Sequence, residues 1–297
     1  MTPATAGVVL VTHTTRAEVL GALASLAGHP GPMVVVDSGS SDGTAEAVRA
    51  AHPEVHVLEL DNVGYGRGVN AGVVALPGEV DVIVAANADV RFGPGAIEAL
   101  VSALAGDPGV ALVGPRVHYP DGSHQASARR SPSISTALGH AAIGWLIPDN
   151  SATRRYHALD LTGPDVLDPV DVDWVSGCAF AVRRSDFDAV GGFDPGYRLF
   201  VEDVDLCDRL RARGRRIRFV PDALVEHRVG ASTEHRPLRA RIDHARALER
   251  YLSREGRGPA RYLRPLLWPG LAAWVAATSL ATAVRGTDRS TTGERRR

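Results

Sequence analysis

Short apolar runs alternate with segments of helical periodicity along the first part of the chain. A helical pattern follows each of the first four runs. Apolar runs of strand length occupy residues 8–11, 33–37, 55–60, 80–85 and 110–113. Repetition of strand, loop and helix is typical of an α/β fold in which right-handed crossovers connect parallel strands. The pattern therefore predicts a parallel α/β sheet flanked by helices.

The periodicity weakens after residue 115 and returns near residue 172. Turn residues are frequent between residues 116 and 173, where one amphipathic helix is predicted over residues 134–147. The later elements are a strand-like run at 172–182, a helix at 204–213, strands at 216–220 and 224–227, and a helix at 243–254.

These patterns suggest three parts of the chain. Residues 1–235 would form the sheet domain, with residues 116–173 as an insert that shapes the site of a second substrate. Residues 236–286 would form a C-terminal helical extension. The last residues, 287–297, are polar and rich in arginine, which predicts a disordered tail.

Polar residues stand where the predicted parallel strands end. Asp37 closes the second strand, a glycine-rich loop that starts at Gly64 follows the third, and Asp89 follows the fourth. Ligands of such sheets bind beyond the carboxyl ends of the strands. We therefore expect these three segments to meet in one crevice, although they are far apart in the sequence.

Two adjacent acids, Glu202 and Asp203, follow an apolar-aromatic run and precede a helical pattern in which Leu206 and Leu210 share a face. This position predicts that Asp203 lies at or near the start of a helix, where free backbone N–H groups stabilise a carboxylate. Acids are common at helix starts. The local pattern therefore fits a helix cap as well as it fits a catalytic pair.

Three further motifs are weak when each is taken alone. The segment Asn87-Ala88-Asp89 suits a hard cation bound to a diphosphate, but also an ordinary turn. His227, just after a strand, suits a structural histidine at least as well as a ligand. The glycines of the Gly64 segment do not form a dinucleotide fingerprint, because they follow the third strand and have a different spacing.

Composition and charge bear on which partners the protein binds and in which cellular compartment it is found. The chain has 297 residues, a formal net charge of -1 and two cysteines. The near-zero charge gives no support for a nucleic-acid partner, and the few cysteines suit a reducing compartment. We see no signal peptide, so the expected location is the cytoplasm.

One uncharged segment, residues 265–284, has about the length of a membrane span, but its many Ala, Thr and Ser residues make it only weakly apolar. We expect it to lie on a membrane surface or to pack against the protein, in preference to spanning a membrane.

Taken together and in order, the motifs resemble the inverting glycosyltransferases of family 2. The resemblance implies their GT-A fold, a Rossmann-like architecture with a mixed, mainly parallel sheet flanked by helices. The resemblance covers roughly residues 7–232 and rests on VVLVTHTT, VVVDSGSSDGT, NVGYGRGVNAG, AANADV, WVSGCAFAVRR, GGFDPGYRLFVEDVDLCDRLRARG and VEHRVGAST. Each motif alone is permissive, whereas the ordered set is specific. The run from WVSGCAFAVRR to VEDVDLC is most similar to rhamnosyltransferase-type members.

The resemblance implies a set of donor-binding roles. Thr12 and Asp37 would hold the nucleoside of a nucleotide-sugar donor, and Arg67 would lie near its base or diphosphate. Asp89 would bind a divalent cation, Mg²⁺ or Mn²⁺, through the diphosphate. His227 would approach the same cation, or the diphosphate, from the C-terminal side.

The resemblance also implies the reacting groups. Trp174 and Gly177 would form part of the sugar and acceptor pocket, Asp203 would be the general base, and Glu202 would orient the donor sugar or the acceptor. The chain departs from the family in two places. His13-Thr14-Thr15 stands where Asn is frequent, and the DxD motif has become Asn87-x-Asp89, with Asn87 among the donor-binding residues and one strong carboxylate left.

The expected reaction is transfer of a sugar from a nucleotide-diphospho-sugar, dTDP-rhamnose or a UDP- or GDP-sugar, to a hydroxyl of a saccharide or polyprenyl-linked glycan, with inversion. A lipid-linked acceptor would place the enzyme, as a peripheral protein, at the cytoplasmic face of the cell membrane. Two alternatives stay open. One is a nucleotidyltransferase that makes sugar nucleotides, and the other is a catalytically silent module that binds sugar nucleotides.

Overall fold

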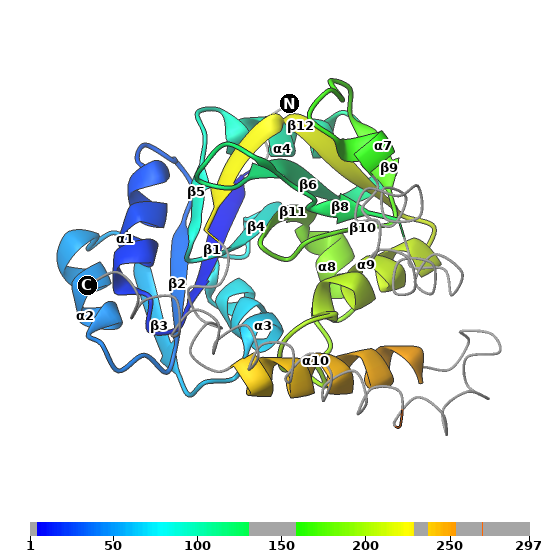
Figure 1. Cartoon of the computed structure of the whole chain (residues 1–297). Coiled ribbons are helices and arrows are strands. Elements are labelled where there is room, and N and C mark those ends of the chain that lie inside the picture. The colour runs from blue at the N-terminus through cyan, green and yellow to red at the C-terminus, as the bar shows by residue number, and fades with distance from the viewer. Residues whose placement is uncertain (1–4, 131–158, 229–236, 254–268, 270–297) are drawn as a thin grey trace, which may run out of the picture. The chain divides into compact units, whose positions relative to one another are not determined.

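A computed structural model describes residues 5–130, 159–228, 237–253 and 269 (Figure 1). Its helices are α1 (Arg16–Ser25), α2 (Thr44–Ala51), α3 (Tyr65–Ala75), α4 (Ala96–Ala105), α7 (Leu159–Thr162), α8 (Arg184–Ala189), α9 (Glu202–Ala212) and α10 (Pro237–Leu252). Its strands are β1 (Ala6–Thr12), β2 (Met33–Ser38), β3 (His56–Leu60), β4 (Val82–Asn87), β5 (Val90–Phe92), β6 (Val110–His118), β7 (His124–Gln125), β8 (Ala128–Arg129), β9 (Val170–Val172), β10 (Trp174–Val175), β11 (Ala179–Arg183) and β12 (Arg216–His227).

Ten strands form one sheet, whose central order is β3-β2-β1-β4-β11-β6-β12-β5, with β7 beside β6 and β9 beside β12. The first four strands pair in parallel, and β6 pairs in parallel with β12. The short strand β11 runs antiparallel to both β4 and β6, so these two strands point the same way. The expected mixed, mainly parallel sheet is therefore confirmed.

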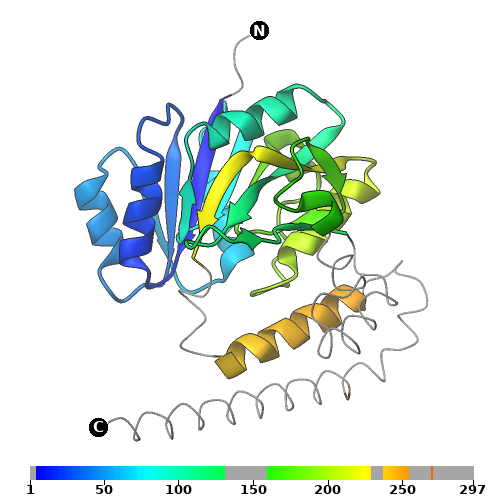
Figure 2. The ribbon, with the colours of Figure 1, turned by 45° about the horizontal axis from the view of Figure 1, so that its top comes forward.

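Helices cover both faces of the sheet, because residues alternate in direction along each strand. On one face, Val8 and Leu10 of β1 share a core with the buried sides of α1, α2 and α4. On the other face, Val9 packs in a core with residues of α3, α8 and α9. Helices α1 and α2 lie side by side in both views of the ribbon (Figures 1 and 2).

The glycine-rich segment after β3 is helical and not the loop that the sequence suggested. Helix α3 begins directly after Gly64, so the glycines that follow lie within it. A Cβ added at Gly72 would lie 2.4 Å from Cγ1 of Val9, and one at Gly68 would lie 3.0 Å from Cγ1 of Val11. These glycines let α3 approach β1 closely, and this close packing outweighs their low helix propensity.

The later strands also differ from the expected boundaries. The predicted run at 172–182 divides into β9, β10 and β11, because β10 leaves the main sheet and pairs with β8. The two strands predicted at 216–220 and 224–227 are one strand, β12, with an irregularity between Val220 and Leu224. The described ends of the 116–173 segment add β7 and β9 to the main sheet. The helix predicted at 134–147 lies outside the described residues.

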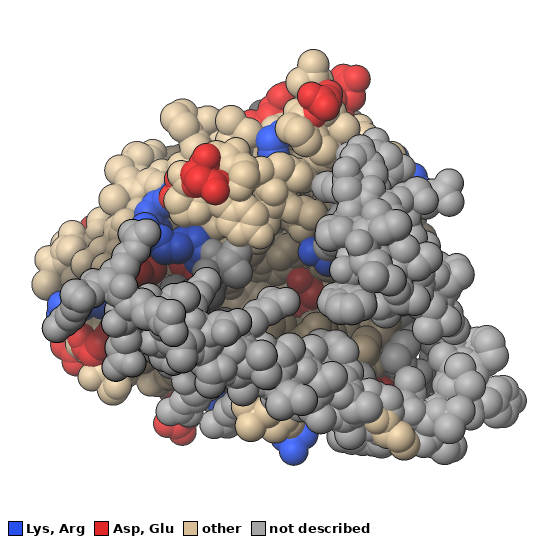
Figure 3. Space-filling view, viewed as in Figure 1, with Lys and Arg blue, Asp and Glu red and all other residues tan. Residues whose placement is uncertain are grey.

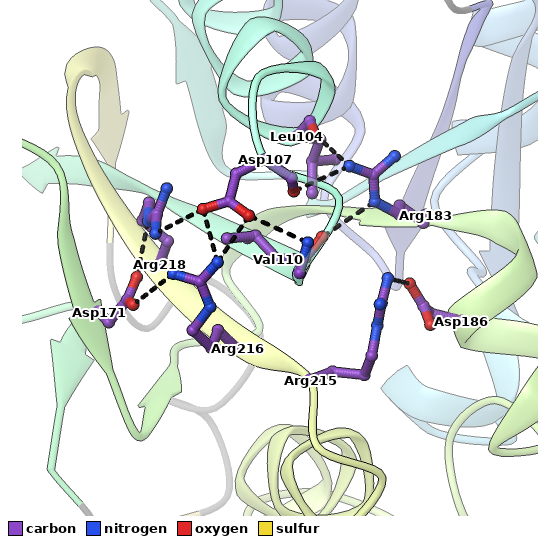
Figure 4. A network of polar contacts seen from close by, with 10 residues as sticks. Leu104, Asp107, Val110, Asp171, Arg183, Asp186, Arg215, Arg216 and Arg218 are labelled. Atoms are coloured by element: carbon purple, nitrogen blue, oxygen red, sulfur yellow. Dashed lines mark hydrogen bonds and ion pairs between the residues drawn. The ribbon is translucent and has the colours of Figure 1, made fainter.

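A network of ion pairs lies at the amino-terminal ends of β6 and β12 (Figure 4). The guanidinium of Arg216 donates to both oxygens of Asp107 at 2.6 Å and to Asp171 at 3.1 Å. Arg218 donates to Asp171 at 2.6 Å, and Arg183 donates to the carbonyl of Asp107 at 3.1 Å. The network ties β9 and β12 to the turn before β6, at the opposite end of these strands from His227.

Residues Tyr197–Val201 belong to a second compact unit together with the described residues from 237 onward. Within it, the Phe200 ring stacks on His244 of α10 at 5.1 Å, and the Arg250 guanidinium lies 5.4 Å from the centre of the Tyr197 ring. Phe200 and Val201 both have positive φ, 71° and 65°, a strained conformation for bulky residues.

No helix among the described residues has the length and apolar character for a membrane span. Of the uncharged segment 265–284, the structure describes only residue 269. The tail at 287–297 also lies outside the described residues. The domain limits drawn from the sequence at residues 235 and 286 stay predictions.

Candidate active site

The strand register brings three of the expected site residues to one edge of the sheet. Thr12 pairs with Asp37 across β1 and β2, and Val11 pairs with Asn87 across β1 and β4. All three strands are parallel, so this edge is the carboxyl end at which ligands of α/β sheets bind. Figure 3 shows acidic and basic atoms close together in a hollow near the centre of the displayed face.

The buried carboxylate of Asp37 accepts the backbone N–H of Ser40 at 2.9 Å, which closes the turn after β2. His13 lies beside this turn, with Nδ1 2.8 Å from the carbonyl oxygen of Ser38 and Nε2 3.1 Å from the amide nitrogen of Asn62. The hydroxyl of buried Thr12 bonds that of Thr15 at 2.8 Å. These contacts join the ends of β1, β2 and β3 in one polar cluster.

Asp89 and His227 meet at the same edge. Asp89 stands between β4 and β5, and His227 ends β12, which pairs antiparallel with β5. Nε2 of His227 lies 3.3 Å from Oδ1 of Asp89, and both side chains are about nine-tenths buried. On the other side of the imidazole ring, Nδ1 lies 3.1 Å from Nε2 and 3.2 Å from Oε1 of Gln125.

The acid pair begins α9, as the sequence predicted. Asp203 is half-buried, and its two oxygens accept the backbone N–H groups of Gly177 and Val204, each at 2.8 Å. Glu202 is buried, and its Oε2 has no hydrogen-bond partner among the described residues. Asp203 thus caps the helix and also reaches the turn before β11, so the capping and catalytic interpretations are compatible.

Burial sets the protonation of this pair. Desolvation raises the pKa of Asp203, while the Gly177 and Val204 N–H groups oppose the rise. Desolvation also raises the pKa of Glu202 to about 8, and the negative charge of Asp203 adds to this effect. With a pKa of about 8, the carboxyl of Glu202 holds its proton at neutral pH.

Two observations link the acid pair to Asp89. The backbone N–H of Asn87 donates to the carbonyl of Cys178 at 2.9 Å, so the turn that holds Asp203 also touches the end of β4. The buried thiol of Cys178 has a pKa raised first by desolvation and then by the charges of Asp203 and Asp89. Both carboxylates therefore lie near one thiol, on the same side of the molecule.

Trp174 lies on β10, just before the Ser176–Cys178 turn. Its indole N–H donates to the carbonyl of Arg130 at 3.2 Å, and the Arg129 guanidinium stands 5.3 Å from the centre of its ring. The charge of Arg129 also acts on Asp203, where it lowers the pKa. Arg129 therefore interacts with both Trp174 and Asp203.

The charged side chains of Arg67 and Asp205 interact with other parts of the protein. Arg67 lies on α3, where Nε and Nη2 both donate to the carbonyl of Pro195, at 2.8 and 2.5 Å. Its role near the donor diphosphate stays a prediction. Asp205, the third acid of the cluster, is fully buried and pairs with Arg209 at 2.8 Å. This ion pair fixes α9 from within and leaves Asp205 unavailable to a substrate.

Sequence reasoning missed two residues that support the site. Tyr65, the first residue of α3, is buried and donates its hydroxyl to the carbonyl of Gly177 at 2.5 Å. Gln125 belongs to a two-residue strand inside the weakly patterned region. Neither carries a motif of its own. Only the position of Tyr65 inside the glycine-rich segment could have drawn attention to it.

Comparison with known proteins agrees with this geometry. Residues 8–190 match the family described as glycosyl transferase family 2, and residues 169–235 match the N-terminal domain of galactosyltransferase. The chain is 36% identical, over 88% of its length and 87% of the relative, to an N-acetylglucosaminyl-diphospho-decaprenol L-rhamnosyltransferase of Mycobacterium tuberculosis. It is also 39% identical to rhamnosyltransferase WbbL of Escherichia coli, over 44% of this chain and 46% of that protein.

Solved structures share the fold at low sequence identity. Glucosyl-3-phosphoglycerate synthase of Mycobacterium tuberculosis, in complex with Mn²⁺, UDP and phosphoglyceric acid, has a TM-score of 0.54 at 18% identity, over 83% of this chain and 78% of that chain. GalNAc-T7 with UDP, GalNAc and Mn²⁺ has a TM-score of 0.55 at 16% identity, over 76% of this chain and 44% of that chain. The fold is thus GT-A, and the chain belongs to glycosyltransferase family 2, as a relative of the rhamnosyltransferases.

Proposed function

We propose that this protein transfers L-rhamnose from a nucleotide-diphospho-rhamnose, such as dTDP-rhamnose, to N-acetylglucosamine carried on a polyprenyl diphosphate. The observation that carries the proposal is the 36% identity to the mycobacterial rhamnosyltransferase over nearly the whole of both chains. That relative is named for a lipid-linked acceptor. If the acceptor of this protein is also lipid-linked, the enzyme acts at the cytoplasmic face of a membrane.

The acid pair supports an inverting mechanism with Asp203 as general base. Asp203 is partly exposed at the start of α9, and two backbone N–H groups hold its carboxylate in place. It removes the proton of the acceptor hydroxyl as that oxygen attacks C1 of the sugar from the face opposite the leaving group. A positioned base of this kind accelerates such a step by about 10²–10⁴.

Glu202 then acts as a neutral orienting group. Its carboxyl is buried, has a raised pKa and holds an oxygen without a partner among the described residues. A protonated carboxyl can donate a hydrogen bond, which a carboxylate cannot do. We assign to Glu202 the orientation of a hydroxyl of the donor sugar or of the acceptor.

Asp89 and His227 suit a divalent cation. Octahedral ligands at about 2.1 Å from an ion lie roughly 3 Å from each other, and Oδ1 of Asp89 lies 3.3 Å from Nε2 of His227. No group of three or more His, Cys, Asp or Glu residues forms a complete metal site among the described residues. The diphosphate and water would therefore complete the coordination, as is usual for Mg²⁺ and Mn²⁺.

Bound at these two residues, the cation would neutralise the charge that develops on the departing diphosphate. Solved structures of the same fold contain Mn²⁺ with UDP, which supports a divalent cation here. The imidazole ligand favours Mn²⁺ over Mg²⁺, because Mg²⁺ binds mainly oxygen. We assign four further residues to the nucleotide. Thr12, Asp37 and Asn87 lie at the carboxyl edge of the sheet, and Arg67 lies on helix α3.

The test is a transfer assay with a synthetic polyprenyl-diphosphate N-acetylglucosamine acceptor and a panel of dTDP-, UDP- and GDP-sugars. We expect transfer from dTDP-rhamnose, with an anomeric configuration in the product opposite to that of the donor. Asp203→Asn should lower kcat by about 10²–10⁴ while donor affinity persists. Asp208→Asn, a change on the same helix, is the control. A folded Asp203→Asn variant with parental kcat would refute the role of Asp203.

A further inference from the structure

Gln125 faces the side of His227 that is turned away from Asp89. Both atoms of its amide lie within hydrogen-bond distance of Nδ1 of His227, Nε2 at 3.1 Å and Oε1 at 3.2 Å. Asp89 lies on the opposite side of the ring, 3.3 Å from Nε2. The three side chains form one series of contacts, Gln125–His227–Asp89, which joins β7, the end of β12 and the turn between β4 and β5.

The two ring nitrogens of a neutral histidine have opposite roles, since one carries hydrogen and the other carries a lone pair. To donate to Asp89, His227 needs the hydrogen on Nε2, and Nδ1 then needs a donor. To bind a cation, His227 needs the lone pair on Nε2, and Nδ1 then needs an acceptor. The amide of Gln125 offers a donor and an acceptor at almost equal distance.

We propose that Gln125 is a positioning residue that serves both tautomers of His227, so that this histidine can exchange its bond to Asp89 for a bond to the cation. The proposal rests on the metal site of the proposed function. In the cation-free protein, the NH₂ group of Gln125 donates to Nδ1. In the cation-bound protein, Nδ1–H donates to Oε1 of Gln125 after the amide has turned over.

Other side chains could not serve both states. A carboxylate at position 125 only accepts hydrogen bonds, so it would hold the hydrogen on Nδ1 and keep Nε2 free for a cation. A hydrocarbon would leave a buried ring nitrogen without a partner in both states. His227 is 7% exposed, so water replaces the missing partner poorly.

The experiment measures Mn²⁺ affinity by calorimetry in the presence of saturating dTDP, for the full chain and for Gln125→Leu and Gln125→Glu. We expect Gln125→Leu to weaken Mn²⁺ binding by about 10–100-fold, the usual effect of losing the outer partner of a metal-bound histidine. Gln125→Glu should bind Mn²⁺ at least as tightly as the parent. Ser123→Ala, an exposed change in the turn before β7, should bind Mn²⁺ like the parent.

A second measurement reads the tautomer directly. Nitrogen-15 NMR of the cation-free protein should show the hydrogen of His227 on Nε2 alone in the parent, whereas Gln125→Glu should show a hydrogen on Nδ1. Parental Mn²⁺ affinity in both Gln125 variants, together with weak binding in His227→Ala, would overturn the role of Gln125 and leave the metal site standing. Parental affinity in Asp89→Asn and His227→Ala would refute the metal site itself, and the proposal with it.

Discussion

Replacing Glu202 by Gln should make the protein more stable, and increasingly so as the pH rises. The carboxyl of Glu202 is buried with no partner for Oε2 among the described residues, and its pKa rises from 4.5 to about 8 on folding. Below pH 4.5 both the folded and the unfolded chain hold this proton. Between these two values only the folded chain holds it, so folding stability falls as the pH rises.

The size of the effect follows from the same pKa values. Each pH unit between 4.5 and about 8 lowers the free energy of unfolding by about 1.4 kcal/mol. The full loss is at most about 5 kcal/mol and is reached above about pH 8. A glutamine side chain cannot ionise, so the variant avoids this loss. The stability of Glu202→Gln relative to the parent should therefore climb between about pH 5 and pH 8 and level off above it.

Urea unfolding at a series of pH values, with the free energy extrapolated to water, measures this difference. Glu79→Gln is the matched control, because Glu79 is exposed and the same substitution there should give a difference near zero that does not vary with pH. A Glu202→Gln difference that stayed constant from about pH 5 to pH 8 would refute the assignment of a neutral, buried carboxyl. Activity gives a second reading, since the parent should lose transfer above about pH 8 and the variant should not.

Two further substitutions test the supports of the site. Tyr65→Phe removes the hydroxyl that holds the Gly177 carbonyl, at about 1 kcal/mol of stability for a buried bond; kcat should fall with KM nearly unchanged, and a pure stability loss without a change in kcat would argue against a positioning role. Gly72→Ala places a Cβ 2.4 Å from Val9 and should lower the free energy of unfolding by about 1–3 kcal/mol. Thermal unfolding against Gly78→Ala, where nothing lies within 4 Å, checks it, and equal melting points would contradict the close packing of α3.

The sequence predicted the sheet and one edge of the site well, for a physical reason. Parallel strands buried on both faces appear as continuous apolar runs, and the polar residues that follow them must lie at one edge. Asp37 and Asp89 were located by this rule, and the register places Asp37 at this edge together with Asn87, two residues before Asp89. Asp203 was located by its place before a helical pattern, and α9 does begin at this pair.

The parts that the sequence did not predict depend on contacts between distant residues. The helix α3 was taken for a loop because its glycines have low helix propensity, whereas tight packing against β1 favours them. Gln125 and His227 are 102 positions apart, and the strand that carries Gln125 has only two residues. A strand of two residues shows no periodicity in the sequence. No local pattern could therefore predict that the amide of Gln125 contacts His227.

The antiparallel strand β11 explains why the base and the cation ligands lie together. In a wholly parallel sheet, the segment before a strand would lie at the edge opposite the ligand site. Because β11 runs the other way between β4 and β6, the turn before it lies at the carboxyl edge. From there the N–H of Gly177 holds Asp203, while the carbonyl of Cys178 accepts the N–H of Asn87. The reversed direction of β11 thus lets one turn, Ser176–Cys178, contact both α9 and the end of β4. The position of this turn therefore sets the distance between Asp203 and Asp89.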